Sequence, residues 1–109
     1  MNIKRTLIIL MFTASIFGSS TKEPETIIPF NLTYDDVADI LPIDDLKGKV
    51  IVQFTVDENG RVVKPQILNT FSDKLSETIL KRVLAIEFNP ALQNGKPIQV
   101  KYHLPILFK

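Results

Sequence analysis

Few side chains in this 109-residue sequence could carry out chemistry. His103 is the only histidine, and the alternation of residues around it places it on the polar face of a strand, beside Lys101. A catalytic base needs a nucleophile or carboxylate within reach, and none is near, so we interpret His103 as an exposed side chain or a partner contact. The chain has no cysteine, which excludes disulfides, thiolate metal sites and a lipidated cysteine anchor.

Clustered carboxylates are the second candidate for chemistry. Asp35 and Asp39 have helical spacing, and Asp44 and Asp45 follow them, so a weak cation site is conceivable. Calcium loops have a denser pattern that contains glycine, and we therefore interpret these residues as solvated carboxylates. The sequence also lacks a glycine-rich phosphate loop and a nucleophile elbow. It predicts no enzyme, no metal site and no cofactor.

The first 20 residues predict an export signal (1–20). Lys4 and Arg5 precede an uncharged apolar stretch, Leu7 to Phe17, which ends in small residues. We expect cleavage after Ser20. A retained membrane anchor is the alternative, but a spanning helix needs about 20 consecutive apolar residues and this stretch is shorter.

Charge divides the rest of the chain into two parts. Residues 23 to 45 contain seven acidic side chains and no basic one, whereas residues 46 to 109 contain ten basic and five acidic side chains. The net charge of +1 gives no indication of a nucleic-acid partner. Because residues 21 to 45 include three prolines and no sustained period, we interpret them as an acidic linker, with one short turn capped by Thr33 and Asp36.

Residues 46 to 109 predict one small α+β domain. Alternating apolar residues over Val50–Val56 indicate a half-buried strand. The Asn59-Gly60 dipeptide supplies the positive φ angles of a tight hairpin turn, and a return strand follows over about residues 61 to 68. The mixed apolar pattern of this strand allows a bulge, and Pro65 predicts that it has a partner on one side only.

A helix and a third strand complete the predicted β-β-α-β order. The apolar stripe over Leu75–Ile86 predicts a helix that begins near Ser72 and ends near Phe88. A turn at Asn94–Pro97 precedes the third strand. A right-handed crossover then gives a three-stranded antiparallel/mixed sheet of order 2-1-3, with the helix on one face. The third strand, about Ile98 to Leu104, becomes an open edge.

Five segments in this order resemble the C-terminal domain of TonB, the periplasmic energy transducer of outer-membrane transport. They are Gly48–Val62, Gln66–Leu68, Phe88–Ala91, Gly95–Pro97 and Leu104–Phe108. The resemblance implies a protein-binding domain in the periplasm that receives an extended segment of an outer-membrane receptor by β-strand addition. The predicted partner-binding edge is Ile98, Gln99, Val100, Lys101, Tyr102, His103 and Leu104. If the first segment stays as an anchor, the resemblance also implies inner-membrane proton-channel partners.

Two further expectations concern pairing. The segment Glu25, Thr26, Ile27 and Ile28 is similar to the receptor peptide that this family binds, so we hypothesise that it covers the chain's own open edge or that of another copy. A homodimer through this edge would add burial to a small domain. The alternative function is a structural or regulatory module of the cell envelope, without a link to energised transport.

Overall fold

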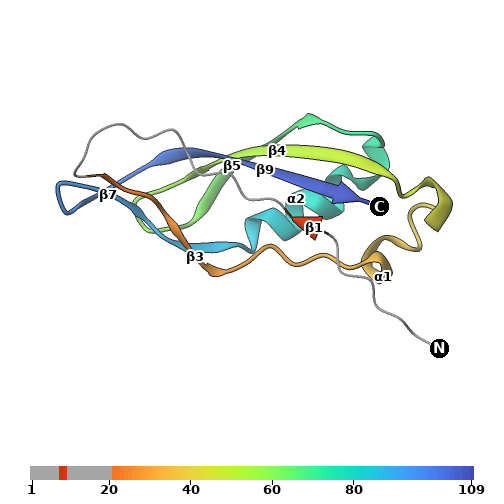
Figure 1. Cartoon of the computed structure of the whole chain (residues 1–109), viewed down its shortest axis with the longest axis horizontal. Coiled ribbons are helices and arrows are strands. Elements are labelled where there is room, and N and C mark those ends of the chain that lie inside the picture. Colours follow the sequence, from red (N-terminus) through yellow and green to blue (C-terminus); the bar gives the residue numbers. More distant parts are fainter. Residues whose placement is uncertain (1–7, 10–20) are drawn as a thin grey trace.

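An antiparallel sheet of four strands, in the order β1-β9-β4-β5, lies at the centre of the structure (Figure 1). The strands are β1 (Ile8–Ile9), β9 (Val100–Phe108), β4 (Gly48–Val56) and β5 (Val62–Asn69). This computed structural model describes residues 8–9 and 21–109. Except for β1, the predicted export signal, with its cleavage after Ser20, lies outside the described residues.

The strand β4 forms because its apolar side chains alternate with polar ones. Val50, Val52, Phe54 and Val56 are fully buried on one face, as the alternation predicts. All nine residues of β4 pair with β9, from Gly48 opposite Phe108 to Val56 opposite Val100. This long ladder is the framework on which the other elements pack.

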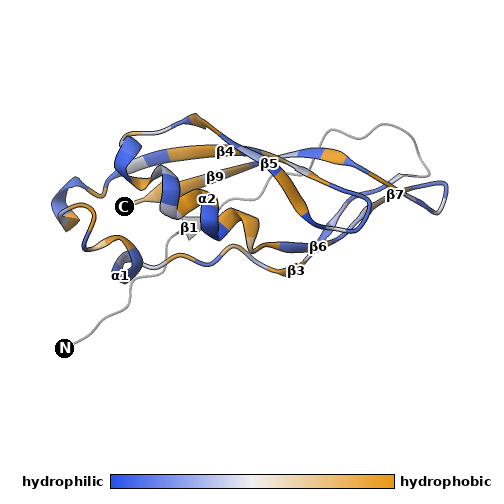
Figure 2. Ribbon diagram, turned by 180° about the vertical axis from the view of Figure 1, so that it is seen from behind, coloured by the Kyte–Doolittle hydropathy of each residue, from blue (hydrophilic) through white to orange (hydrophobic). Residues whose placement is uncertain are grey.

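A single main helix, α2 (Ser76–Leu84), lies across the buried face of this sheet, after a 3-10 turn over Asp73–Leu75. Its Ile79 and Val83 are buried against the strands. Figure 2 shows hydrophobic and hydrophilic residues alternating along α2. The predicted α+β class, with antiparallel strands and one main helix, is confirmed.

The predicted end of the helix near Phe88 is wrong. The helix ends at Leu84, and Phe88 lies in the short strand β6 (Glu87–Asn89). The main-chain N–H of Phe88 donates a hydrogen bond of 2.9 Å to the carbonyl of Gly60, at the β4–β5 turn. This bond holds the chain in an extended conformation where the apolar stripe alone suggests another helical turn.

The sequence predicts a single three-stranded sheet, whereas the structure contains two further small sheets. One has the order β2-β7-β8, formed by Thr21–Lys22, Ala91–Gln93 and Lys96–Ile98. The other pairs β3 (Glu25–Ile28) with β6. In Figure 1 they extend from one end of the central sheet.

The two predicted turns differ in detail. Asn94 (φ 53°) and Gly95 (φ 79°) both adopt positive φ angles between β7 and β8. Between β4 and β5 only Gly60 does (φ 81°), and the carboxylate of Asp57 accepts hydrogen bonds of 2.9 Å from the N–H groups of Asn59 and Arg61. The prediction that Asn59 shares the positive φ is therefore wrong, because this longer turn needs only one left-handed residue.

The segment interpreted as a linker packs against the domain, so that interpretation is wrong. It contains β2, β3, the short helix α1 (Tyr34–Val37) and a 3-10 turn over Ile43–Asp45. Five of its apolar residues are buried in the core: Phe30, Leu32, Tyr34, Val37 and Leu41. The irregular spacing of these residues hides them from any periodic pattern. The predicted short turn is present, since Asp36 Oδ2 accepts a 2.9 Å hydrogen bond from the N–H of Thr33.

Candidate functional site

The predicted edge strand from Ile98 to Leu104 is divided in the structure. Ile98 belongs to β8, opposite Ala91 of β7, and Gln99 lies between β8 and β9. Only Val100 to Leu104 belong to β9, which pairs with β4. The prediction of one continuous strand is wrong because the chain changes from one sheet to another at Gln99.

The position of Pro105 shows which backbone groups of β9 face away from β4. Pro105 lies opposite Ile51 in the ladder and has no N–H to donate. An antiparallel ladder alternates hydrogen-bonded and non-bonded pairs, so this pair is a non-bonded one. Lys101 and His103 lie an even number of residues before Pro105, so they also form non-bonded pairs with β4. Their main-chain N–H and C=O groups therefore point towards the outer edge of β9.

Part of this outer edge already has a partner. The strand β1 pairs with β9 at Leu107 and Ile106. Within residues 8–9 and 21–109, no strand pairs with the outer edge of β9 between Val100 and Leu104. The outward backbone groups of Lys101 and His103 lie in this part of the strand.

The side chains of these residues alternate between two environments. Tyr102 and Leu104 are buried, while Lys101 and His103 are exposed on the face opposite α2. The ring Nε2 of His103 lies 3.2 Å from Oε1 of Gln53, its direct neighbour on β4, at hydrogen-bond distance. The interpretation of His103 as an exposed residue is confirmed. In the described part of the chain, no three His, Asp or Glu side chains form a group that could hold a metal ion.

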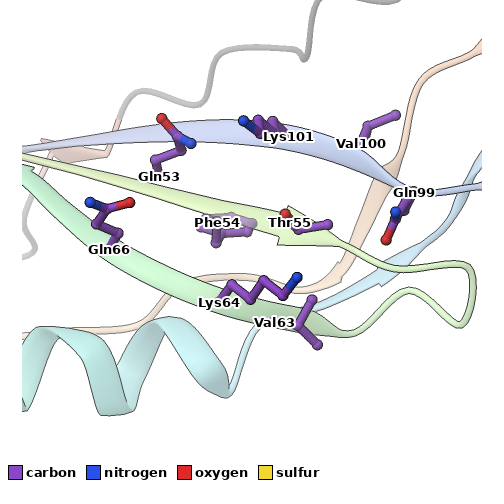
Figure 3. Close-up of a pocket in the computed structure, with 9 residues that line it drawn as sticks. All are labelled: Gln53, Phe54, Thr55, Val63, Lys64, Gln66, Gln99, Val100 and Lys101. Atoms are coloured by element: carbon purple, nitrogen blue, oxygen red, sulfur yellow. The ribbon is translucent and has the colours of Figure 1, made fainter.

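A groove crosses the same exposed face, with a volume of about 540 Å³ (Figure 3). Its polar lining combines three amides, one hydroxyl and two ammonium groups from three strands and the bend before β9. These residues are Gln53, Thr55, Lys64, Gln66, Gln99 and Lys101. No acidic side chain lines the groove. Sequence reasoning missed this site, because the groove depends on how β5 is bent.

The bend in β5 is a β-bulge at Lys64 and Pro65. Gln53 pairs with Gln66 and Thr55 pairs with Val63, so two residues of β5 oppose one residue of β4. Lys64 has a φ of 53°, a left-handed conformation that is uncommon for lysine. The allowed bulge is confirmed. Among the strands of the described residues, β5 pairs with β4 alone, as Pro65 predicts.

The segment Glu25, Thr26, Ile27 and Ile28 lies away from β9. It forms β3 and pairs with β6, with Glu25 opposite Asn89 and Ile28 opposite Glu87. All four residues are exposed. The segment thus pairs with its own chain, but at a different strand from the one that we expected, because β6 is extended rather than helical.

Comparison with known proteins decides the family. The family described as "Gram-negative bacterial TonB protein C-terminal" matches residues 43–109. The chain belongs to this family. Protein TonB of Vibrio cholerae serotype O1 is 28% identical over 65 residues, which are 59% of this chain and 27% of that protein. The chain thus aligns with about a quarter of that relative, and the resemblance carried by the five segments is confirmed.

In this TonB C-terminal domain, an aromatic cluster supports β9 from the core side. The ring of Tyr102 stacks on Phe54, with centroids 5.4 Å apart, and lies 5.2 Å from Phe88. Burial raises the pKa of Tyr102 above its ordinary value of 10.0, and the negative charge of Glu23 raises it further. The cluster packs β9 against the core, on the side of the sheet that carries Tyr102.

Within the described residues of the TonB C-terminal domain and its preceding segment, no helix has the length and apolar character needed to cross a membrane.

Proposed function

We propose that this TonB C-terminal domain acts in the periplasm by binding an extended segment of an outer-membrane receptor in TonB-dependent transport. The segment adds as a strand to the outer edge of β9. The observation that carries the proposal is the stretch from Val100 to Leu104, whose outer edge pairs with no strand of the described chain. Family membership supports the same role.

Strand addition suits the chemistry of this edge. The backbone groups of Lys101 and His103 supply hydrogen bonds of about 0.5–1.5 kcal/mol each in net terms. Their exposed side chains lie on the outer face, where they neighbour alternate side chains of an added strand at about 5 Å. The backbone thus provides affinity for any extended segment, and the side chains select among segments.

A proline substitution tests the proposal. His103→Pro removes one outward N–H but none of the main-chain hydrogen bonds to β4, since Pro105 already occupies a position with the same orientation. It also removes the contact between the His103 ring and Gln53, which the control below removes as well. We expect the variant to fold and to bind the periplasmic segment of a receptor about tenfold more weakly, the equivalent of about 1.4 kcal/mol. The matched control is His103→Ala, which removes the side chain and keeps the N–H.

Titration calorimetry with receptor segments from the same organism would measure both variants. Equal affinity of His103→Pro and His103→Ala would contradict pairing at this edge. A second copy of the chain could occupy the same edge, and sedimentation of the purified protein would detect that dimer and its loss in His103→Pro.

Coupling to inner-membrane proton-channel proteins is a separate part of the proposal and depends on the first 20 residues. The mass of the native protein after cell fractionation determines whether they are retained. A full-length protein in the inner membrane would support coupling. A protein that begins at Thr21 and is released into the periplasm would favour a binding role without direct transduction.

A further inference from the structure

Two Asn-Gly dipeptides, Asn59-Gly60 and Asn94-Gly95, lie in turns between strands, and their surroundings differ. Asn-Gly is prone to lose its side-chain amide, because glycine has no Cβ to shield the main-chain nitrogen that attacks the asparagine side chain. The two dipeptides share this chemistry, so a difference between their rates of reaction in the folded chain comes from the fold.

The turn between β4 and β5 holds Asn59-Gly60 by several hydrogen bonds. The N–H of Gly60 donates one of 2.9 Å to the carbonyl oxygen of Asp57, and the N–H of Asn59 donates one of 2.9 Å to the carboxylate of Asp57. The carbonyl of Gly60 also accepts the bond from Phe88. Gly60 is buried, and the attacking nitrogen is already engaged in a hydrogen bond.

The turn between β7 and β8 leaves Asn94-Gly95 without such constraints. Both residues are exposed, and a Cβ added at Gly95 would meet nothing within 4 Å. In the part of the chain that the structure describes, the main-chain hydrogen bonds of the turns and loops include none from the N–H of Gly95. The turn projects at one end of the molecule (Figure 1). The nitrogen of Gly95 is therefore accessible for attack.

We propose that Asn94 is a modification site, at which the folded chain deamidates through a succinimide, while the fold protects Asn59. The main-chain nitrogen of Gly95 attacks Cγ of Asn94, an N–Cγ bond forms, and the bond from Cγ to the side-chain nitrogen breaks. Ammonia leaves and takes the proton of the Gly95 N–H. Water then opens the ring at either carbonyl, which gives aspartate or isoaspartate. This reaction needs only water, and the inference is independent of the proposed receptor binding.

The two products affect the turn differently. Both of its residues have positive φ angles, which Asp-Gly accommodates as Asn-Gly does. Isoaspartate instead places an additional carbon in the main chain, so a two-residue turn no longer matches the pair of Gln93 and Lys96. Because β7 also pairs with β2, we expect isoaspartate to loosen the whole sheet β2-β7-β8.

Peptide mapping by mass spectrometry of the full chain, incubated in mildly alkaline buffer, tests the inference. We expect Asn94 to convert about tenfold faster than Asn59 in the folded chain, the ratio that one protecting hydrogen bond gives. In guanidinium chloride, which unfolds the chain, the two sites should convert at similar rates. Equal rates in the folded chain, or an Asn94 that converts more slowly than Asn59 there, would overturn the inference.

The variant Asp57→Ala tests the protection of Asn59. It removes the carboxylate that accepts hydrogen bonds from the N–H groups of Asn59 and Arg61. We expect Asn59 to convert about threefold to tenfold faster, while Asn94 keeps its rate. Circular dichroism and the rates in guanidinium chloride distinguish this effect from loss of the fold. An unchanged rate at Asn59 would overturn the role of these bonds.

The variant Asn94→Asp is the matched control for the effect on the sheet. It has the same charge as the isoaspartate product and an ordinary main chain. Hydrogen exchange should be faster for the amides of β7 and β8 in the separated isoaspartate form than in Asn94→Asp. Equal exchange in the two forms would overturn the predicted loosening.

Discussion

The hydroxyl of Tyr34 forms two hydrogen bonds with the main chain of Lys109. It accepts one of 2.9 Å from the N–H and donates one of 2.6 Å to the carbonyl oxygen. The ring of Tyr34 also meets Phe108 edge-on, with centroids 6.3 Å apart. The short helix α1 thereby attaches to the C-terminal end of β9, 75 residues later in the chain.

Replacing Tyr34 with phenylalanine should weaken this attachment. The ring contact with Phe108 remains, while both hydrogen bonds to Lys109 are lost. We expect the free energy of unfolding to fall by about 1–2 kcal/mol, measured by urea denaturation. A denaturation midpoint that does not change would show that water replaces these bonds without cost.

Leu32→Ala tests whether the segment before the matched family region belongs to the fold. Leu32 is only 2% exposed within the core, so its truncation should cost about 2–5 kcal/mol. The control is Ile27→Ala, because Ile27 is 55% exposed on β3 and should change stability by less than about 1 kcal/mol. If both variants lowered the free energy of unfolding by a similar small amount, residues 21 to 45 would instead be a linker that does not contribute to the fold.

Gly60 and Gly95 form a matched pair for measuring a steric contact. Their φ angles are 81° and 79°, so alanine suffers nearly the same backbone strain at both positions, about 1–2 kcal/mol. A Cβ atom at Gly60 would lie 1.8 Å from the carbonyl oxygen of Phe88, whereas one at Gly95 would meet nothing within 4 Å. Gly60→Ala should therefore lower the melting temperature far more than Gly95→Ala. Equal losses would mean that β6 can move away from the turn at little cost.

Tyr102 should make stability depend on alkaline pH. Because its pKa is raised in the folded protein, the folded state holds the phenol proton more tightly than the unfolded state does. The resulting stability is complete below about pH 10, the ordinary pKa of tyrosine, and decreases as the pH rises through the raised pKa. Urea denaturation between neutral pH and pH 11 should show this decrease. It should be smaller in Glu23→Gln and absent in Tyr102→Phe, and an identical decrease in Tyr102→Phe would assign it to other groups.

Sequence patterns predict well those elements whose apolar residues recur at a regular spacing and are buried on one face. The alternation over Val50–Val56 is visible because Val50, Val52, Phe54 and Val56 are all buried on one face of β4. The apolar stripe of the helix gives its position but not its end, because a tertiary hydrogen bond between Phe88 and Gly60 decides where the chain becomes extended.

The remaining elements depend on contacts between residues far apart in the sequence. The strand β3 has four exposed residues and becomes a strand only through pairing with β6, about 60 residues later. The groove likewise requires the bulge at Lys64 to face Lys101 across β4, and neither residue has a distinctive sequence pattern. An edge of β9 that pairs with no described strand between Val100 and Leu104 was predictable in kind, whereas the break at Gln99 was not.

The uninterrupted register between β4 and β9 determines how the domain responds to tension. Inter-strand hydrogen bonds of an antiparallel pair run perpendicular to the strands, so a pull along β9 loads all nine residue pairs in shear at the same time. The ladder between β4 and β5 is interrupted by two shifts of register, and its pairs can separate in groups. A strand added to β9 would thus be attached to the most mechanically resistant part of the sheet.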